Sequence, residues 1–199
     1  MNWLKISGIS GIIAPPIAFA LTMLAIAYSP SFSWTENALS DLGVQEGVTA
    51  VLFNTGLITS GVLAVFFATG LFKFLQKNAL GGIGAFVFVV DAFALTAIGV
   101  FPENVKPIHF YASVAFFVLF PISMFFLGAA FLRMHRMKLG FFTFIVAIFA
   151  AIVWTIPFGE GVAIPETLSA LSASAWSIVL GFKMVKEGIQ TINVRFRGR

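Results

Sequence analysis

Long apolar runs alternate with short polar segments along the whole chain. A helix that crosses a bilayer needs roughly 20 mostly apolar residues, and six of the runs meet this requirement. The pattern therefore predicts an all-α integral membrane protein, folded as a six-transmembrane-helix antiparallel bundle in one domain over residues 1–199. The predicted spans lie at about 8–28, 47–72, 81–101, 108–132, 139–158 and 166–185.

The composition excludes most soluble classes. Hydrophobic residues make up 59% of the chain and charged residues 10%, and the mean hydropathy is +1.00. Because about a quarter of the residues are charged in a typical soluble domain, this chain is neither a soluble enzyme nor a disordered protein. It has no cysteine, which also excludes a disulfide scaffold, a thiolate nucleophile and a Cys-ligated metal.

Basic and acidic residues lie on opposite sides of the predicted membrane. Every Lys and Arg except Lys106 lies before the first span, at or beyond the end of the last span, or in the second or fourth connection. Cytoplasmic segments of membrane proteins are enriched in Lys and Arg, so both termini are expected in the cytoplasm of a multi-pass cell-membrane protein. The outer carboxylates are then Glu36, Asp41, Glu46, Glu103, Glu160 and Glu166.

The charge pattern also indicates which partners to expect. The net charge of +4 reflects membrane orientation and attraction to anionic lipids, so membrane lipids are expected partners and nucleic acid is not. Small-residue runs such as those at Ser7-Gly8 and Gly81-Gly82 permit close helix contacts. These contacts fit either a single chain or a homo-oligomer.

The first outer loop, about residues 29–46, contains a helix-start signal. Ser33-Trp34-Thr35-Glu36 matches a capping box, and Gly43 suits the position just after a helix end. We therefore expect a short interfacial helix over about residues 34–42, with Asn37, Ser40 and Asp41 in its last turn. That helix is either a solvated loop or a polar wall over a cavity between the spans.

Asp91 is the acidic residue inside a span. It lies near the middle of the third run, where a bare charge costs several kcal/mol. We therefore expect it to face the bundle interior, either protonated or well hydrogen-bonded. Asn54 in the second span is an expected partner. The alternatives are a structural hydrogen bond between helices and a proton relay or contact with a polar ligand.

His109 opens the fourth span on the acidic side, with Ser113 one turn deeper, and Glu166 opens the sixth span in the same way. A histidine near carboxylates is suited to act as a general base. One hypothesis has Ser40 or Ser113 as nucleophile, His109 as base, and Asp41 or Glu166 orienting it. A His/Asp/Glu metal site is only weakly indicated, and the sequence assigns no metal ligand and no cofactor.

Three motifs are similar to the signature of a known membrane family. Residues 37–43 read N-A-L-S-D-L-G and residues 52–58 read L-F-N-T-G-L-I, while Gly99-Val100-Phe101-Pro102 precedes His109. Ile164-Pro165-Glu166 with Trp176 resembles the last motif, although Thr167 stands where the family pattern has a basic residue. The chain thus resembles the prokaryotic six-helix family catalogued as domain of unknown function 998. The resemblance implies six helices in a cell membrane and brings no established activity.

Three functions remain open from the sequence. The first is a lipid-active membrane enzyme, a hydrolase or group transferase, whose outward-facing site has His109, Asp41, Ser40 and Glu166 as catalytic residues. The second is a non-enzymatic lipid or small-molecule binding or transport protein, with Asn54, Asp91, Asn37 and Ser113 as binding residues. The third is a structural or regulatory subunit. In the first two cases, polar residues at the starts of spans two, four and six line one outward cavity with Asp91 at its floor.

Overall fold

The computed structural model describes residues 2–75 and 78–197, with side chains through Gln190. Within this part of the chain there are six long helices, two short 3-10 helices and no strand. The long helices are α1 (Trp3–Ala27), α2 (Val48–Phe74), α3 (Ala79–Val100), α4 (Ile108–Arg133), α5 (Met137–Ile152) and α6 (Ala163–Arg197). The 3-10 helices are η1 (Leu39–Val44) and η2 (Val153–Thr155). All six long segments have the length and hydropathy of membrane spans, so the protein is a multi-pass integral membrane protein.

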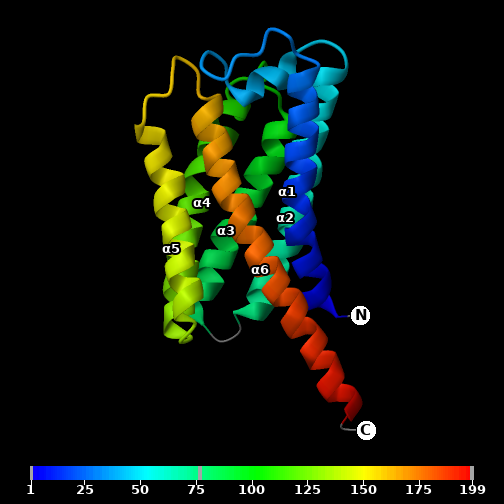
Figure 1. Ribbon diagram of the computed structural model, residues 1–199, viewed down its shortest axis with the longest axis vertical. Coiled ribbons are helices and arrows are strands. Elements are labelled where there is room, and N and C mark those ends of the chain that lie inside the picture. Colours follow the sequence, from blue (N-terminus) through cyan, green and yellow to red (C-terminus); the bar gives the residue numbers. More distant parts are fainter. Residues whose placement is uncertain (1, 76–77, 198–199) are drawn as a thin grey trace.

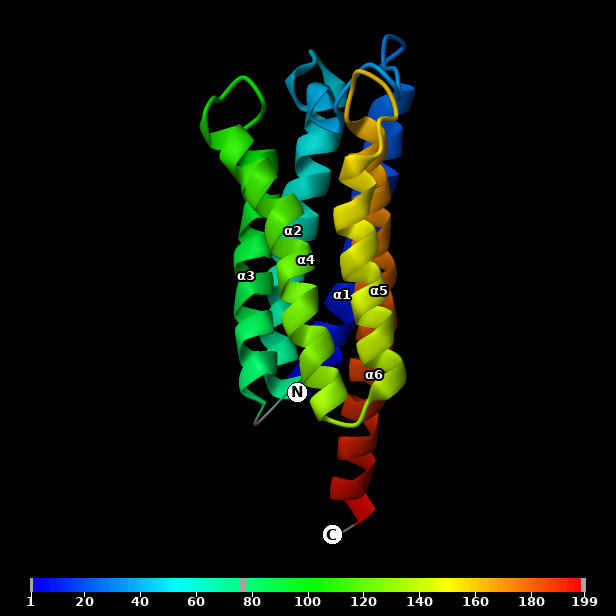
Figure 2. The same ribbon diagram turned by 90° about the vertical axis from the view of Figure 1, so that its left-hand side faces the viewer.

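The helices run alternately up and down, and each packs against its neighbours in chain order (Figures 1 and 2). Helix α6 also packs along α1, whereas its contact with α5 is smaller, so the six helices form a ring. Both termini lie at the same end, and α6 continues past the other helices there (Figure 1). We call this end the basic end, and we call the end formed by residues 28–47, 101–107 and 153–162 the acidic end.

The boundaries of the spans were predicted to within a few residues in most places. Helices α1 and α6 are longer than predicted, because a helix continues its backbone hydrogen bonds into polar segments that hydropathy does not mark. Helix α5 ends at Ile152, earlier than predicted, and passes into η2 before Pro157. The residue before a proline is biased away from helical geometry, which accounts for this early end.

Helix α1 contains Pro15 and Pro16, and a neighbouring helix accommodates the first of them. Pro15 has no N–H, so it cannot donate the usual helical hydrogen bond to the carbonyl of Gly11. The Ser177 hydroxyl on α6 donates to that carbonyl at 3.0 Å. Membrane helices tolerate proline where a neighbour satisfies the freed carbonyl. Because the donor lies on α6, the same hydrogen bond also joins α6 to α1.

The hydrophobic core fills the ring from its middle toward the basic end. At its centre the Trp176 side chain is fully buried and lies 5.8 Å from the Phe67 ring and 5.5 Å from the Phe88 ring. The Trp176 indole N–H donates to the Thr143 hydroxyl at 3.0 Å. Buried tryptophan needs such a partner. The axis of the bundle is therefore closed by side chains at this depth.

The helix predicted over residues 34–42 is wrong. Residues 34–36 form a turn, and the helical segment is η1, which includes Gly43 rather than ending before it. The Asn37 side chain accepts a hydrogen bond from the Ser33 main-chain N–H at 2.9 Å, and the Ser33 hydroxyl pairs with the Thr35 hydroxyl. These local bonds replace the capping box, because short polar side chains compete with the backbone for hydrogen bonds.

Candidate functional site

The first loop of the acidic end, residues 28–47, docks on the start of α6. A new helix begins with main-chain N–H groups that lack helical partners, and here the loop supplies carbonyl acceptors. The bonds run from Gly161 N to Thr35 O at 2.8 Å, from Val162 N to Asn37 O at 3.0 Å, and from Ala163 N to Asn37 O at 2.9 Å. The loop is thereby held across the end of the helix ring.

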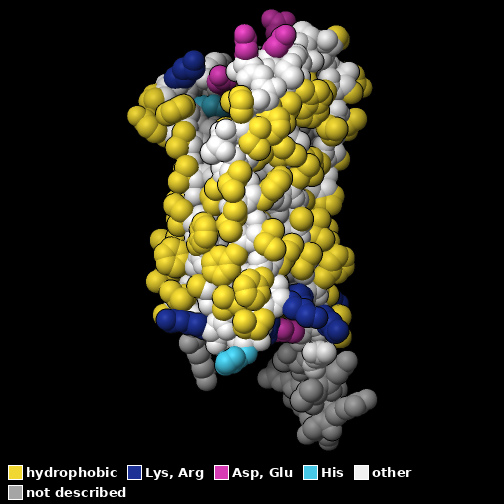
Figure 3. Space-filling view, turned by 60° about the vertical axis from the view of Figure 1, so that its left-hand side comes forward, with side chains coloured by type: hydrophobic (Ala, Val, Ile, Leu, Met, Phe, Trp, Pro, Cys, Tyr) yellow, Lys and Arg dark blue, Asp and Glu magenta, His cyan; other side chains and the backbone are white. Residues whose placement is uncertain are grey.

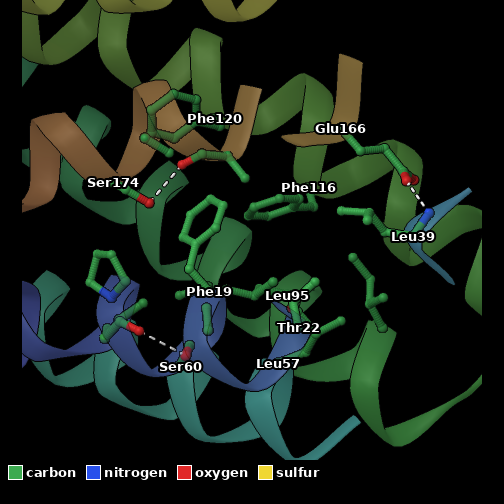
Figure 4. Close-up of a pocket in the computed structure, with 18 of the residues that line it drawn as sticks. Phe19, Thr22, Leu39, Leu57, Ser60, Leu95, Phe116, Phe120, Glu166 and Ser174 are labelled. Atoms are coloured by element: carbon green, nitrogen blue, oxygen red, sulfur yellow. Dashed lines mark hydrogen bonds between the residues drawn. The ribbon is translucent and has the colours of Figure 1, made fainter. Parts of the chain in front are cut away.

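Glu166 fixes the same loop from the first turn of α6. Its carboxylate accepts a hydrogen bond from the Leu39 main-chain N–H at 2.7 Å, as Figure 4 shows. The side chain is 8% exposed, and the helix start favours a negative charge at this place. Glu166 therefore joins the loop to the helix and contributes one wall of the cavity described below.

Asp41, Ser40 and Glu103 bring two loops of the acidic end together. The Asp41 carboxylate accepts hydrogen bonds from the Asn37 side-chain amide at 2.8 Å and from the Ala38 N–H at 3.0 Å. The Ser40 hydroxyl donates to the Glu103 carboxylate at 3.4 Å. Burial raises the pKa of Glu103, and a hydrogen bond with Asp41 and the charge of Asp41 raise it further, against the opposing effects of His109 and Ser40.

His109 is 5% exposed at the start of α4. Its Nδ1 lies 2.8 Å from the Phe101 carbonyl oxygen. Since a carbonyl only accepts hydrogen bonds, Nδ1 carries the proton, and in the neutral ring Nε2 is the basic nitrogen. The Ser40 hydroxyl donates to Glu103 instead of to this nitrogen. His109 is thus oriented as a base is, while Ser40, one of its two expected serine partners, bonds elsewhere.

A cavity of about 150 Å³ lies below the docked loop, between α1, α2, α3, α4 and α6. Its walls are largely apolar, and the Phe19 and Phe116 rings point into it (Figure 4). An engineered apolar cavity of roughly this volume in another protein binds benzene. The volume therefore suits one small organic molecule.

The cavity brings together half of the residues predicted for the site. Ser40, Asp91, Ser113 and Glu166 line it. Within the described chain, Asn37, Asp41, Asn54 and His109 are not among the lining residues; they lie at the acidic end around its cover. The cavity lining includes residues near the starts of α2, α4 and α6, but the α2 residue there is the apolar Phe53 rather than the expected Asn54.

Asp91 faces the bundle interior, as expected from the free-energy cost of exposing a charged side chain to the bilayer core. It is 2% exposed and lies nine residues before the end of α3 at Val100, or about 13 Å along the helix. Within the described residues, neither Asp91 Oδ1 nor the Thr167 hydroxyl has a hydrogen-bond partner, and both residues line the cavity. Buried polar atoms almost always have a partner, so these two atoms mark the cavity as a place for one.

Asn54 does not pair with Asp91. Its side-chain amide donates to the Gly43 carbonyl at 2.9 Å, so it fastens η1 to α2. A Cβ atom added to Gly43 would lie 2.7 Å from Asn54 Oδ1. Asn54 and Gly43 therefore form a close contact that shapes the cover of the cavity, and a side chain at Gly43 would push the two segments apart.

Residues 12–183 match the model of a family described as a protein of unknown function, DUF998. The chain belongs to the DUF998 family. The matched region runs from α1 into α6 and includes every residue of the site. No curated protein and no solved structure matches the chain.

Two features of the DUF998 site were not predicted as site features. The sequence places Glu103 only among the outer carboxylates that could join His109 in a weakly indicated metal site, and it does not show that Glu103 meets Ser40 across two loops. Thr167 departs from the family motif, and it also lines the cavity, with a buried hydroxyl that has no hydrogen-bond partner among the described residues. Among the described residues of this DUF998 chain, no three His, Asp or Glu side chains are grouped so that they could hold a metal ion.

Proposed function

We propose that this protein binds a small, largely apolar molecule in the cavity between α1, α2, α3, α4 and α6, and that it does so in the cell membrane with the acidic end outside. The observation that carries the proposal is an apolar cavity of about 150 Å³ whose lining includes Asp91, a buried carboxyl group with one oxygen, Oδ1, that lacks a partner within the described residues. Apolar cavities with a few polar groups are the usual form of a ligand site.

A purely structural role explains the hydroxyl residues better than it explains Asp91. Ser60, Ser123 and Ser177 each donate to a carbonyl of a neighbouring helix, at 2.9, 2.8 and 3.0 Å. These bonds join helices, as polar residues in membrane bundles commonly do. Asp91 Oδ1 makes no such bond within the described chain, and a ligand in the cavity is what we propose as the partner of this carboxyl group.

The lipid-enzyme hypothesis has less geometric support. Nucleophilic catalysis needs a serine within hydrogen-bond reach of its base. Among the described residues neither Ser40 nor Ser113 hydrogen-bonds to His109, and Ser40 donates to Glu103 instead. Binding is therefore the function that the arrangement favours over hydrolysis or group transfer.

The proposal is tested with a substitution that fills the cavity with a larger apolar side chain and leaves the charge of the cavity unchanged. Ala170 lines the cavity and Ala175 is exposed on the same helix, so Ala170→Leu blocks the site and Ala175→Leu is the matched control. Thermal unfolding of the detergent-purified protein is followed with and without benzene. A ligand at ten times its Kd stabilises the folded state by about 1.4 kcal/mol, so wild type and Ala175→Leu are expected to gain several degrees in Tm. Ala170→Leu is expected to gain none, and an equal gain in all three proteins would contradict the proposal.

A further inference from the structure

We infer that the ligand of this cavity is a small organic cation, with an ammonium group beside Asp91 and an apolar body against the surrounding aromatic rings. The inference rests on the proposed binding function and adds the chemical class of the ligand. It follows from the charges that line the cavity, from the kind of apolar wall, and from the charge of the end through which a ligand from outside would enter.

The charged residues that line the cavity have one sign. Asp91 and Glu166 are acidic, and among the described lining residues there is no Lys, Arg or His. A buried charge is tolerated when it is paired and hydrogen-bonded. Glu166 already accepts from Leu39 N, whereas Asp91 Oδ1 has no partner within the described chain. A cationic N–H group supplies both the countercharge and the hydrogen bond that Asp91 lacks.

The apolar wall is rich in aromatic rings. The lining rings are Phe19, Trp34, Phe53, Phe67, Phe88, Phe116, Phe117 and Phe120. The face of an aromatic ring attracts a cation, and the attraction grows when water is excluded. A cavity lined by a carboxyl group and by aromatic rings is therefore suited to an alkylammonium ion, whose charge and hydrocarbon part both find matching surfaces.

The acidic end favours the same charge before binding. Glu36, Asp41, Glu46, Glu103 and Glu160 lie at this end and outnumber its one lysine, Lys106, among the described residues, and Figure 3 shows acidic side chains gathered there. Such a field raises the local concentration of cations and their rate of association. A carboxylate ligand would meet repulsion both at this end and at Asp91. A bare divalent metal ion would find too few oxygen ligands in an apolar wall.

Three probes of equal length separate charge from shape. The purified full-length protein is titrated at pH 7 with hexylammonium, 1-hexanol and hexanoate, and binding is followed by the intrinsic tryptophan fluorescence, to which Trp34 in the cavity lining contributes. We expect hexylammonium to bind about tenfold or more tightly than 1-hexanol, the size of one hydrogen bond to a charged group, and hexanoate to bind weakest.

Two variants then test whether Asp91 is the residue that recognises the charge of the ligand. Asp91→Asn keeps the size of the side chain and removes its charge, and it is expected to abolish the preference for hexylammonium over 1-hexanol. Glu46→Gln removes an exposed acidic charge at the same end and is expected to preserve the preference. A preference that survives in Asp91→Asn would overturn the role of Asp91.

The outcomes distinguish this inference from the proposed function. If 1-hexanol binds as tightly as hexylammonium to the wild type, the cavity binds ligands but the cationic class is wrong. If none of the three probes binds, the proposed function fails as well. The wild-type comparison needs no variant, so it decides the ligand charge whether or not Asp91→Asn folds.

Discussion

Glu103 lies half-buried in the connection between α3 and α4, where it accepts a hydrogen bond from Ser40. Burial raises its pKa first, and Asp41 raises it further. The folded protein therefore holds a proton on Glu103 at pH values where the unfolded chain has already lost it. The free energy of unfolding consequently falls as the pH rises from the ordinary carboxyl value of 4.5 through the raised native value.

Glu103→Gln is expected to remove this part of the pH dependence. The amide has no proton to lose, so the variant should be more stable than wild type at neutral pH, by less than about 1 kcal/mol because the site is partly solvated. The two proteins should converge below pH 4.5. The measurement is Tm against pH in detergent, with Glu46→Gln, an exposed residue of the same end, as the control. A Glu103→Gln variant less stable than wild type at neutral pH would contradict the assignment.

At the scale of elements, small residues decide how closely the helices approach. A Cβ atom added to Gly61 on α2 would lie 2.7 Å from the main-chain nitrogen of Thr96 on α3 and 3.0 Å from its Cα. Neither atom can move without moving the helix. Gly82 on α3 offers a contrast, because a Cβ atom there meets nothing within 4 Å.

Gly61→Ala and Gly82→Ala therefore form a matched pair. Gly61→Ala forces α2 and α3 apart and is expected to cost about 1–3 kcal/mol of stability, as overpacking does elsewhere. Gly82→Ala is expected to be neutral or to stabilise by up to about 1 kcal/mol, because alanine favours the helix. Unfolding in mixed micelles measures both, and equal losses would show that α2 and α3 are not in the close contact described.

The docked loop is also an element-scale feature. The main chain at Gly161 passes so close to the main chain of Glu36 and Asn37 that an added Cβ atom would overlap both. Three main-chain hydrogen bonds and the Glu166 carboxylate then fix the loop in place. The cover of the cavity thus depends on backbone contacts rather than on exposed polar side chains.

For the whole molecule, charge divides the bundle into two ends with an apolar band between them (Figure 3). Lys and Arg gather at the basic end, where both termini lie, and most carboxylates lie at the acidic end. Basic residues remain preferentially in the cytoplasm during insertion. We therefore predict that the acidic end faces outward.

Single cysteines test this orientation directly, because the natural chain has none. Glu46→Cys at the acidic end and Lys138→Cys at the basic end both replace exposed side chains. In intact cells a membrane-impermeant maleimide is expected to label only Glu46→Cys, and Lys138→Cys should react only after permeabilisation. The cysteine-free wild type is the control, and the reverse labelling pattern would place the cavity cover inside the cell.

The sequence by itself determined the class of protein, the six spans and the family. The reason is physical: a bilayer core of fixed thickness requires about 20 apolar residues in a helix that satisfies its own hydrogen bonds. This signal is local and can be seen in each run separately. The burial of Asp91 followed in the same way, because the cost of a charge depends on its depth in the membrane and not on which residues surround it.

Only the tertiary structure decided which residues share the cavity. Asn54 bonds to Gly43 rather than to Asp91, and His109 lies beside the cover rather than in the cavity wall. The helix expected over residues 34–42 does not form, and the Asn37 carbonyl instead accepts main-chain hydrogen bonds from the start of α6, more than a hundred residues away. Apolar spans look alike on all sides, so the rotation of each helix is set by close contacts such as Gly61 with Thr96, and these contacts leave no periodic signal in the sequence.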